Sequence, residues 1–181
     1  MRYTLIDRIV EIEPGRRLTA VKVVSLSEDY LRDHFPRFPV LPGVFMLEAM
    51  TQASAWLVRS SEDFSHSIVV LKEAINVKYA DFVPPGKMLT VTVELKNQDA
   101  TTTTLVTTGL VEGNKTVSGR LVLERFNLAD TRPEEASTDL YVKREMRTLF
   151  SMLTRECRMV ASTESAESTS ASATTAGNVM G

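Results

Sequence analysis

The 181-residue sequence has one cysteine, two histidines and almost no excess of charge. The single cysteine, Cys157, excludes a disulfide within the chain and is typical of a reducing compartment. The formal net charge is −2, and residues 1–127 hold 15 basic and 15 acidic side chains, so no basic patch favours a nucleic-acid partner. The first residues have no apolar stretch of the signal-peptide kind, and we expect a cytoplasmic protein.

The sequence also has no apolar run long enough to span a membrane. The most apolar stretch, Val44 to Leu57, falls short of the ~18–20 residues that a span requires and contains Glu48 and Gln52. Its residues are good helix formers, and the Pro42-Gly43 pair before it suits a helix start. We therefore predict a helix over residues 44–57 that is buried on every side.

A stiff, non-helical segment leads into this predicted helix. Pro36, Pro39 and Pro42 recur at every third position, and each fixes its own φ and restricts the residue before it. The segment begins at His34. We expect it to hold that histidine on a rigid loop near the start of the helix.

Extended segments flank the helix and predict an α+β fold. Two strands precede it, joined by a Pro14-Gly15 turn, and four follow it. The expected strands are residues 3–12, 18–26, 68–79, 88–97, 101–111 and 116–126, with a hairpin turn at 112–115. A mostly antiparallel sheet curled around one long helix would bury that helix, so we predict this arrangement for residues 1–126.

The composition changes after Phe126. Residues 127–137 are predicted to form a linker, and residues 138–160 an amphipathic helix that packs on its own domain or on a second copy. An interaction handle for another protein is the alternative for this helix. Residues 161–181 are rich in Ser, Thr and Ala, which is typical of a disordered tail.

Three groups in the central stretch could perform acid–base chemistry on a thioester. The imidazole of His34 can accept a proton near neutral pH. Burial in an apolar helix disfavours the charged form of a carboxyl, so Glu48 could donate a proton or hold a water. The Gly43 N–H, at a helix start, could polarise a carbonyl oxygen. Taken singly, such a histidine or glutamate is more often structural, and spacing alone does not decide between the two interpretations.

The same residues resemble the signature of a known enzyme family. His34-Phe35-Pro36, Pro39, Pro42-Gly43-Val44, Leu47 to Met50 and Gln52 are similar to the central motif of the bacterial 3-hydroxyacyl-[acyl-carrier-protein] dehydratases, which have the hot-dog fold. His34 and Glu48 are 14 residues apart, which is the separation found in this family. The resemblance covers about residues 3–126, including Pro84-Pro85-Gly86.

This resemblance implies the roles of individual residues. It implies His34 and Glu48 as the catalytic pair, contributed by different subunits of a homodimer, with a trimer of dimers as a further arrangement. It implies Gly43 and Val44 at the carbonyl-binding helix start, with Gln52 in support. An acyl carrier protein would deliver the substrate, and neither a metal nor another cofactor is implied.

The sequence departs from the family pattern in two places. Asp33 and Arg37 stand where the family usually has glycine, and the basic cluster before the Pro-Gly break is reduced to Lys78. Two alternative functions therefore stay open: a hot-dog acyl thioesterase, and a non-catalytic subunit that binds acyl chains or a partner.

Overall fold

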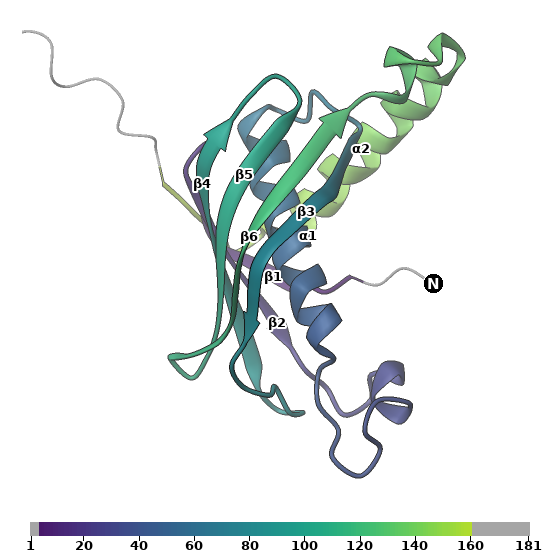
Figure 1. The fold of residues 1–181 in the computed structure, drawn as a ribbon. Coiled ribbons are helices and arrows are strands. Elements are labelled where there is room, and N and C mark those ends of the chain that lie inside the picture. Colours follow the sequence, from purple (N-terminus) through teal and green to yellow (C-terminus); the bar gives the residue numbers. More distant parts are fainter. Residues whose placement is uncertain (1–3, 161–181) are drawn as a thin grey trace, which may run out of the picture.

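A seven-stranded sheet bends around one long helix in the computed structural model, which describes residues 4–160 (Figure 1). The strand order is β3-β6-β5-β4-β2-β1-β7, and every pair is antiparallel except β1 with β7. The strands are β1 (Arg8–Glu13), β2 (Arg17–Val23), β3 (Ile68–Tyr79), β4 (Met88–Gln98), β5 (Thr102–Val111), β6 (Asn114–Phe126) and β7 (Arg158–Met159). The helices are α1 (Gly43–Ser61) and α2 (Ala136–Leu153), with short 3-10 turns at Asp29–Arg32, Leu128–Asp130 and Pro133–Glu135.

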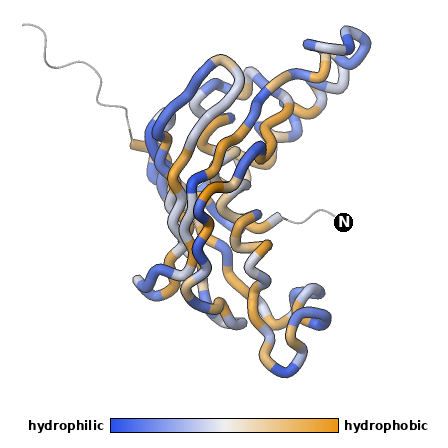
Figure 2. The backbone as a smooth tube through the Cα atoms, viewed as in Figure 1, coloured by the Kyte–Doolittle hydropathy of each residue, from blue (hydrophilic) through white to orange (hydrophobic). Residues whose placement is uncertain are grey.

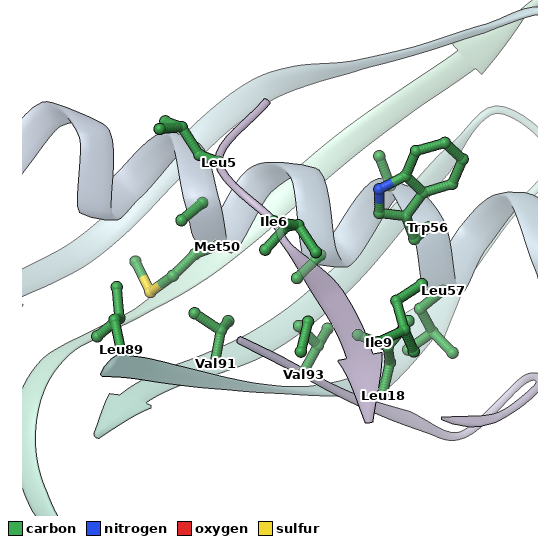
Figure 3. Close-up of a cluster of buried hydrophobic side chains, with 14 of the residues drawn as sticks. Leu5, Ile6, Ile9, Leu18, Met50, Trp56, Leu57, Leu89, Val91 and Val93 are labelled. Carbon is green, nitrogen blue, oxygen red and sulfur yellow. The ribbon is translucent and has the colours of Figure 1, made fainter. Parts of the chain in front are cut away.

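The α+β prediction and the curled hot-dog sheet are confirmed. The core lies between α1 and the inner face of the sheet, and buried side chains alternate with less buried ones along β4 and β5 (Figure 3). On β4, for example, Leu89, Val91 and Val93 are fully buried. Burying each such side chain contributes about 1.5–3 kcal/mol. Figure 2 shows the same pattern along the chain, with apolar residues on α1 and the strands and hydrophilic ones at most loops.

The central helix is longer than predicted and is not buried on every side. It runs from Gly43 to Ser61, and its C-terminal half is enclosed by the sheet and by α2. Near its start, however, Val44 is 67% exposed and Glu48 is also exposed. The reason is that the sheet of a single chain wraps only part of the helix surface.

The segment after β6 differs from the predicted linker and helix. Residues 127–137 are folded into two 3-10 turns and the first turn of α2, and Asn127 and Asp130 form a capping box. The helix ends at Leu153 rather than at residue 160, because the chain turns and Val160 N–H donates to the Ile12 carbonyl at 2.9 Å. β7 thereby pairs with the outer edge of β1. The predicted tail, 161–181, lies outside the described residues.

The apolar stripe of α2 packs on its own chain, as one of the two interpretations expected. Leu153 is buried, and the Phe150 ring lies 5.9 Å from Trp56 and 5.4 Å from Phe64, measured between ring centroids. At the helix surface Arg147 donates to Asp63 at 2.7 Å. In residues 4–160 no helix is both long and apolar enough to cross a membrane.

A buried carboxylate ties the start of α2 to the sheet. Asp139 is 4% exposed and accepts hydrogen bonds from the Ser67 hydroxyl and from the N–H groups of Leu128 and Ala129. Burial alone would raise the pKa of Asp139, but these hydrogen bonds and the charge of Lys143 outweigh it, and the net effect is a lowered pKa. The carboxylate form is therefore the one that the fold stabilises.

We expect Asp139→Asn to lower the melting temperature by roughly 5 °C near neutral pH, because one amide oxygen cannot accept all three donors. Since the folded pKa of Asp139 lies below its ordinary value of 3.8, its stabilisation is present above that pH and is lost as the pH falls through the folded pKa. Thermal unfolding of wild type and Asp139→Asn at several pH values measures this difference in melting temperature. The gap between wild type and variant should shrink below about pH 4. The exposed Asp33→Asn is the control and should match wild type; an equal gap at every pH would contradict the assignment.

Candidate active site

A short, closed turn holds His34 beside the start of α1. The His34 N–H donates to the Tyr30 carbonyl at 3.2 Å, and the Phe38 N–H donates to the Phe35 carbonyl at 2.7 Å, closing a turn over Pro36 and Arg37. The imidazole is half-buried, and its ring centroid lies 4.5 Å from that of Phe35. Backbone hydrogen bonds therefore close the chain on both sides of the histidine.

The unusual backbone in this loop falls on Phe35 and not on the positions that lack the family's glycines. Phe35 has a φ of +49°, whereas Asp33 has a φ of −101° and Arg37 is not among the positive-φ residues. The chain therefore accommodates Asp33 and Arg37 without backbone strain. The left-handed conformation of Phe35 costs on the order of 1 kcal/mol and changes the direction of the chain before Pro36.

The start of α1 presents unpaired backbone donors next to this loop. Pro42 precedes the helix, and its carbonyl accepts from the N–H groups of Phe45 and Met46 at 2.9 and 3.1 Å. The N–H groups of Gly43 and Val44 come before any intrahelical acceptor. A 19-residue helix also directs the positive end of its dipole to this point. The site can therefore stabilise a carbonyl oxygen that gains negative charge.

Glu48 is positioned by a chain of two hydrogen bonds. Gln52 donates from Nε2 to Glu48 Oε1 at 2.9 Å, and Gln52 Oε1 accepts from the Leu5 N–H at 2.9 Å. The Leu5 bond fixes which end of the amide faces Glu48, so Gln52 acts on the carboxyl only as a donor. Residues four apart lie on one face of a helix, and here that spacing brings the Gln52 amide to the Glu48 carboxyl.

A single chain does not bring His34 and Glu48 into contact. In the described part of the chain no hydrogen bond or ion pair joins them, and Glu48 is exposed rather than buried as the sequence argument assumed. No group of three or more potential metal-ligating side chains is present within residues 4–160. Exposed apolar side chains surround the open site: Phe35, Phe38, Val44, Tyr79 and Phe82.

Sequence reasoning missed the aromatic residues of the β3–β4 side of this site. Tyr79, the last residue of β3, lies against Gly43, and Phe82 packs edge-on against Phe38 with ring centroids 5.5 Å apart. The Leu41 N–H donates to the Val83 carbonyl at 2.9 Å and joins the same two loops. The only sequence signal was that both aromatic residues lie within five residues before the Pro84-Pro85-Gly86 break.

A family model for the FabA-like domain matches residues 1–125. The chain belongs to the FabA-like family. Two curated relatives carry the name 3-hydroxyacyl-[acyl-carrier-protein] dehydratase FabZ. The chain is 41% identical over 93 residues to that of Symbiobacterium thermophilum, covering 51% of this chain and 66% of the relative, just under two thirds of its length. It is 33% identical over 120 residues to that of Caldicellulosiruptor saccharolyticus, covering 66% of this chain and 86% of the relative.

The fold is also shared with a solved structure. The structure resembles a chain of the dehydratase heterocomplex ApeI:P from Xenorhabdus doucetiae, with a TM-score of 0.59 and 20% identity, covering 74% of this chain and 90% of that chain. The matched FabA-like residues, 1–125, contain β1 to β6 and α1. Helix α2 and strand β7 therefore lie outside the matched domain: α2 lies near the C-terminal end of α1, away from the loop that precedes α1, and β7 lies at the β1 edge of the sheet (Figure 1).

Proposed function

We propose that this protein removes water from 3-hydroxyacyl thioesters of an acyl carrier protein and forms trans-2-enoyl thioesters, as part of fatty acid synthesis in the cytoplasm. His34 takes the proton from C2 of the substrate. The electrons form the C2–C3 double bond as the bond from C3 to oxygen breaks, and Glu48 gives the proton that lets the hydroxyl leave as water. The proton that His34 holds then returns to Glu48 through solvent.

The backbone at the start of α1 supplies the electrostatic part of this reaction. Removing the C2 proton places negative charge on the thioester oxygen, and the N–H groups of Gly43 and Val44 are the donors that can meet it. Gln52 keeps Glu48 oriented. The observation that carries the proposal is that the FabA-like match, residues 1–125, includes His34, Gly43 and Glu48, and that the start of α1 is left exposed at Val44 and Glu48.

We infer that a second copy of the chain completes the site. Within residues 4–160, strand β3 (12 residues) pairs only with β6 and its other edge is open, whereas β7 covers the edge of β1 at the opposite end of the sheet. An open strand edge favours pairing with another strand. A partner added at β3 would cover Val44 and Glu48 and bring its own His34 to Glu48, as in a symmetric dimer with shared sites. A trimer of such dimers is compatible with this arrangement.

The surface near His34 supports an acidic carrier as the source of substrate. Arg32 and Arg37 are both exposed beside the histidine and carry charge that attracts an acidic partner. Asp33 and Asp81 lie among them and reduce the net positive charge of this surface. We expect carrier docking here to weaken as salt concentration rises.

One assay set tests the proposal against its alternatives. Purified full-length protein is incubated with 3-hydroxyacyl and trans-2-enoyl thioesters of an acyl carrier protein, and hydration state and free thiol are followed together. Reversible water addition without thiol release is the expected result. Thiol release without hydration would replace the proposal with a thioesterase, and tight binding with neither reaction would leave a non-catalytic subunit.

A further inference from the structure

Tyr79 has a fixed backbone at the edge of the proposed site. It ends β3 and pairs with Val117 of β6, and the Ala80 N–H after it donates to the Thr116 carbonyl at 2.8 Å. Its side chain therefore leaves the sheet from an anchored position. Lys78, one residue earlier, pairs with Ser118 in the same ladder.

The Tyr79 ring lies directly against the first residue of α1. A Cβ atom built on Gly43 would meet ring atoms Cε1, Cδ1 and Cζ of Tyr79 at 3.3, 3.4 and 3.6 Å. In an α-helix the Cα–Cβ direction tilts toward the N-terminus. The ring edge that ends at Cζ therefore lies beside Gly43, in the first turn of the helix, where the backbone N–H groups have no intrahelical acceptor.

The phenolic hydroxyl, one bond beyond Cζ, has no partner in the described part of the chain. No hydrogen bond of the Tyr79 side chain is formed within residues 4–160, and the residue is 49% exposed. Burial of the ring raises the pKa of Tyr79 above its ordinary value of 10, so the hydroxyl keeps its proton at neutral pH. It is thus a free donor beside the unpaired donors of the helix start.

We propose that the Tyr79 hydroxyl donates a hydrogen bond to the substrate's thioester oxygen, alongside the backbone N–H of Gly43. This role rests on the proposed dehydration. Two donors converging on one oxygen stabilise the charge that develops as C2 loses its proton, and this stabilisation is larger in the transition state than in the bound substrate. A Cβ at position 43 would move the ring that carries the donor by a few tenths of an ångström.

Tyr79→Phe tests the role of the hydroxyl while keeping the ring against Gly43. We expect kcat for hydration of an enoyl thioester to fall about 10- to 100-fold, with KM changed less than about threefold and the melting temperature unchanged. Tyr141→Phe, which removes an exposed phenol from α2, is the matched control and should leave kcat at the wild-type value. A Tyr79→Phe enzyme with wild-type kcat would overturn the proposal.

A spectroscopic measurement separates this inference from the proposed function. A non-hydratable acyl thioester bound to the protein should show its carbonyl stretch at a lower frequency than in solution, and Tyr79→Phe should return part of that shift. If the wild-type protein does not dehydrate its substrate but the shift and its partial loss are seen, the donor role stands and only the proposed reaction fails. An identical stretch in wild type and Tyr79→Phe would rule out the hydrogen bond.

Discussion

We expect His34→Ala and Glu48→Gln each to lower kcat for dehydration by about 100- to 10,000-fold. The reason is that one proton transfer loses its carrier in each variant. Neither residue contributes much to packing within residues 4–160, because Glu48 is exposed and the half-buried His34 ring has Phe35 as its one aromatic neighbour there. The melting temperature should therefore stay at the wild-type value. Steady-state kinetics and thermal unfolding of the two variants measure both effects.

Mixing the two inactive variants tests whether the site is shared between subunits. If His34 of one chain works with Glu48 of another, a mixed dimer of His34→Ala and Glu48→Gln contains one intact site and one doubly damaged site. Random exchange should then restore about a quarter of the wild-type activity. If both residues of a site came from the same chain, every site in the mixture would carry one defect, and no activity would return.

Matched substitutions away from the site control for these results. His66→Ala removes the second histidine, which pairs with Glu62 at 2.8 Å, and Glu134→Gln changes an exposed carboxyl in the turn before α2. Both variants should keep wild-type turnover. The acid–base assignment is wrong if His34→Ala or Glu48→Gln also keeps wild-type turnover.

The parts of the fold that follow from local sequence patterns were predictable. Strand β3 has the bounds 68–79 that its β-branched run indicated, and Gly15 adopts the positive φ, +78°, that a Pro-Gly turn requires. The two-residue hairpin loop at Glu112-Gly113 likewise has positive φ at both residues. In each case the signal lies within a few residues of the feature that it specifies.

The parts that depend on distant contacts were not predictable. Apolar residues all round α1 indicated burial but could not show that the Val44 and Glu48 face is left open by the chain's own sheet. Arg158 and Met159 have no strand pattern and are extended only because the β1 edge is there to pair with them. The contact of Tyr79 with Gly43 joins two segments that nothing in their local sequence relates.

The same distinction between local signals and distant contacts applies to the candidate site. His34, Gly43, Glu48 and Gln52 were found because they lie in one continuous motif. The hydrogen bond from Leu5 to Gln52 was not foreseen, since the segment before β1 was expected to be part of a strand and instead lies against α1. A motif therefore identifies which groups can react, whereas the groups that orient them come from other parts of the chain.

We expect that ending the chain at Asn127 lowers the free energy of unfolding by on the order of 5 kcal/mol or prevents folding. Helix α2 covers Trp56 and Phe64, each only 6% exposed in the full chain. Removing it exposes both rings together with the end of the α1 surface, and it removes the Asp139 hydrogen bonds and the strand that covers the β1 edge. Residues 1–126 were predicted to form a domain, and this test asks whether that domain is stable without the addition.

Phe150→Ala in the full-length chain tests the same contact without truncation. It should cost about 2 kcal/mol, because the half-buried Phe150 ring bridges Trp56 and Phe64 and leaves a gap when removed. Leu140→Ala, at a 70% exposed position on the same helix, is the control and should change stability by less than about 0.5 kcal/mol. Chemical denaturation measures all three proteins. Two results would contradict this prediction: equal midpoints for Phe150→Ala and wild type, and a truncated chain as stable as the full one. Together they would favour the alternative that α2 is an interaction handle for another protein.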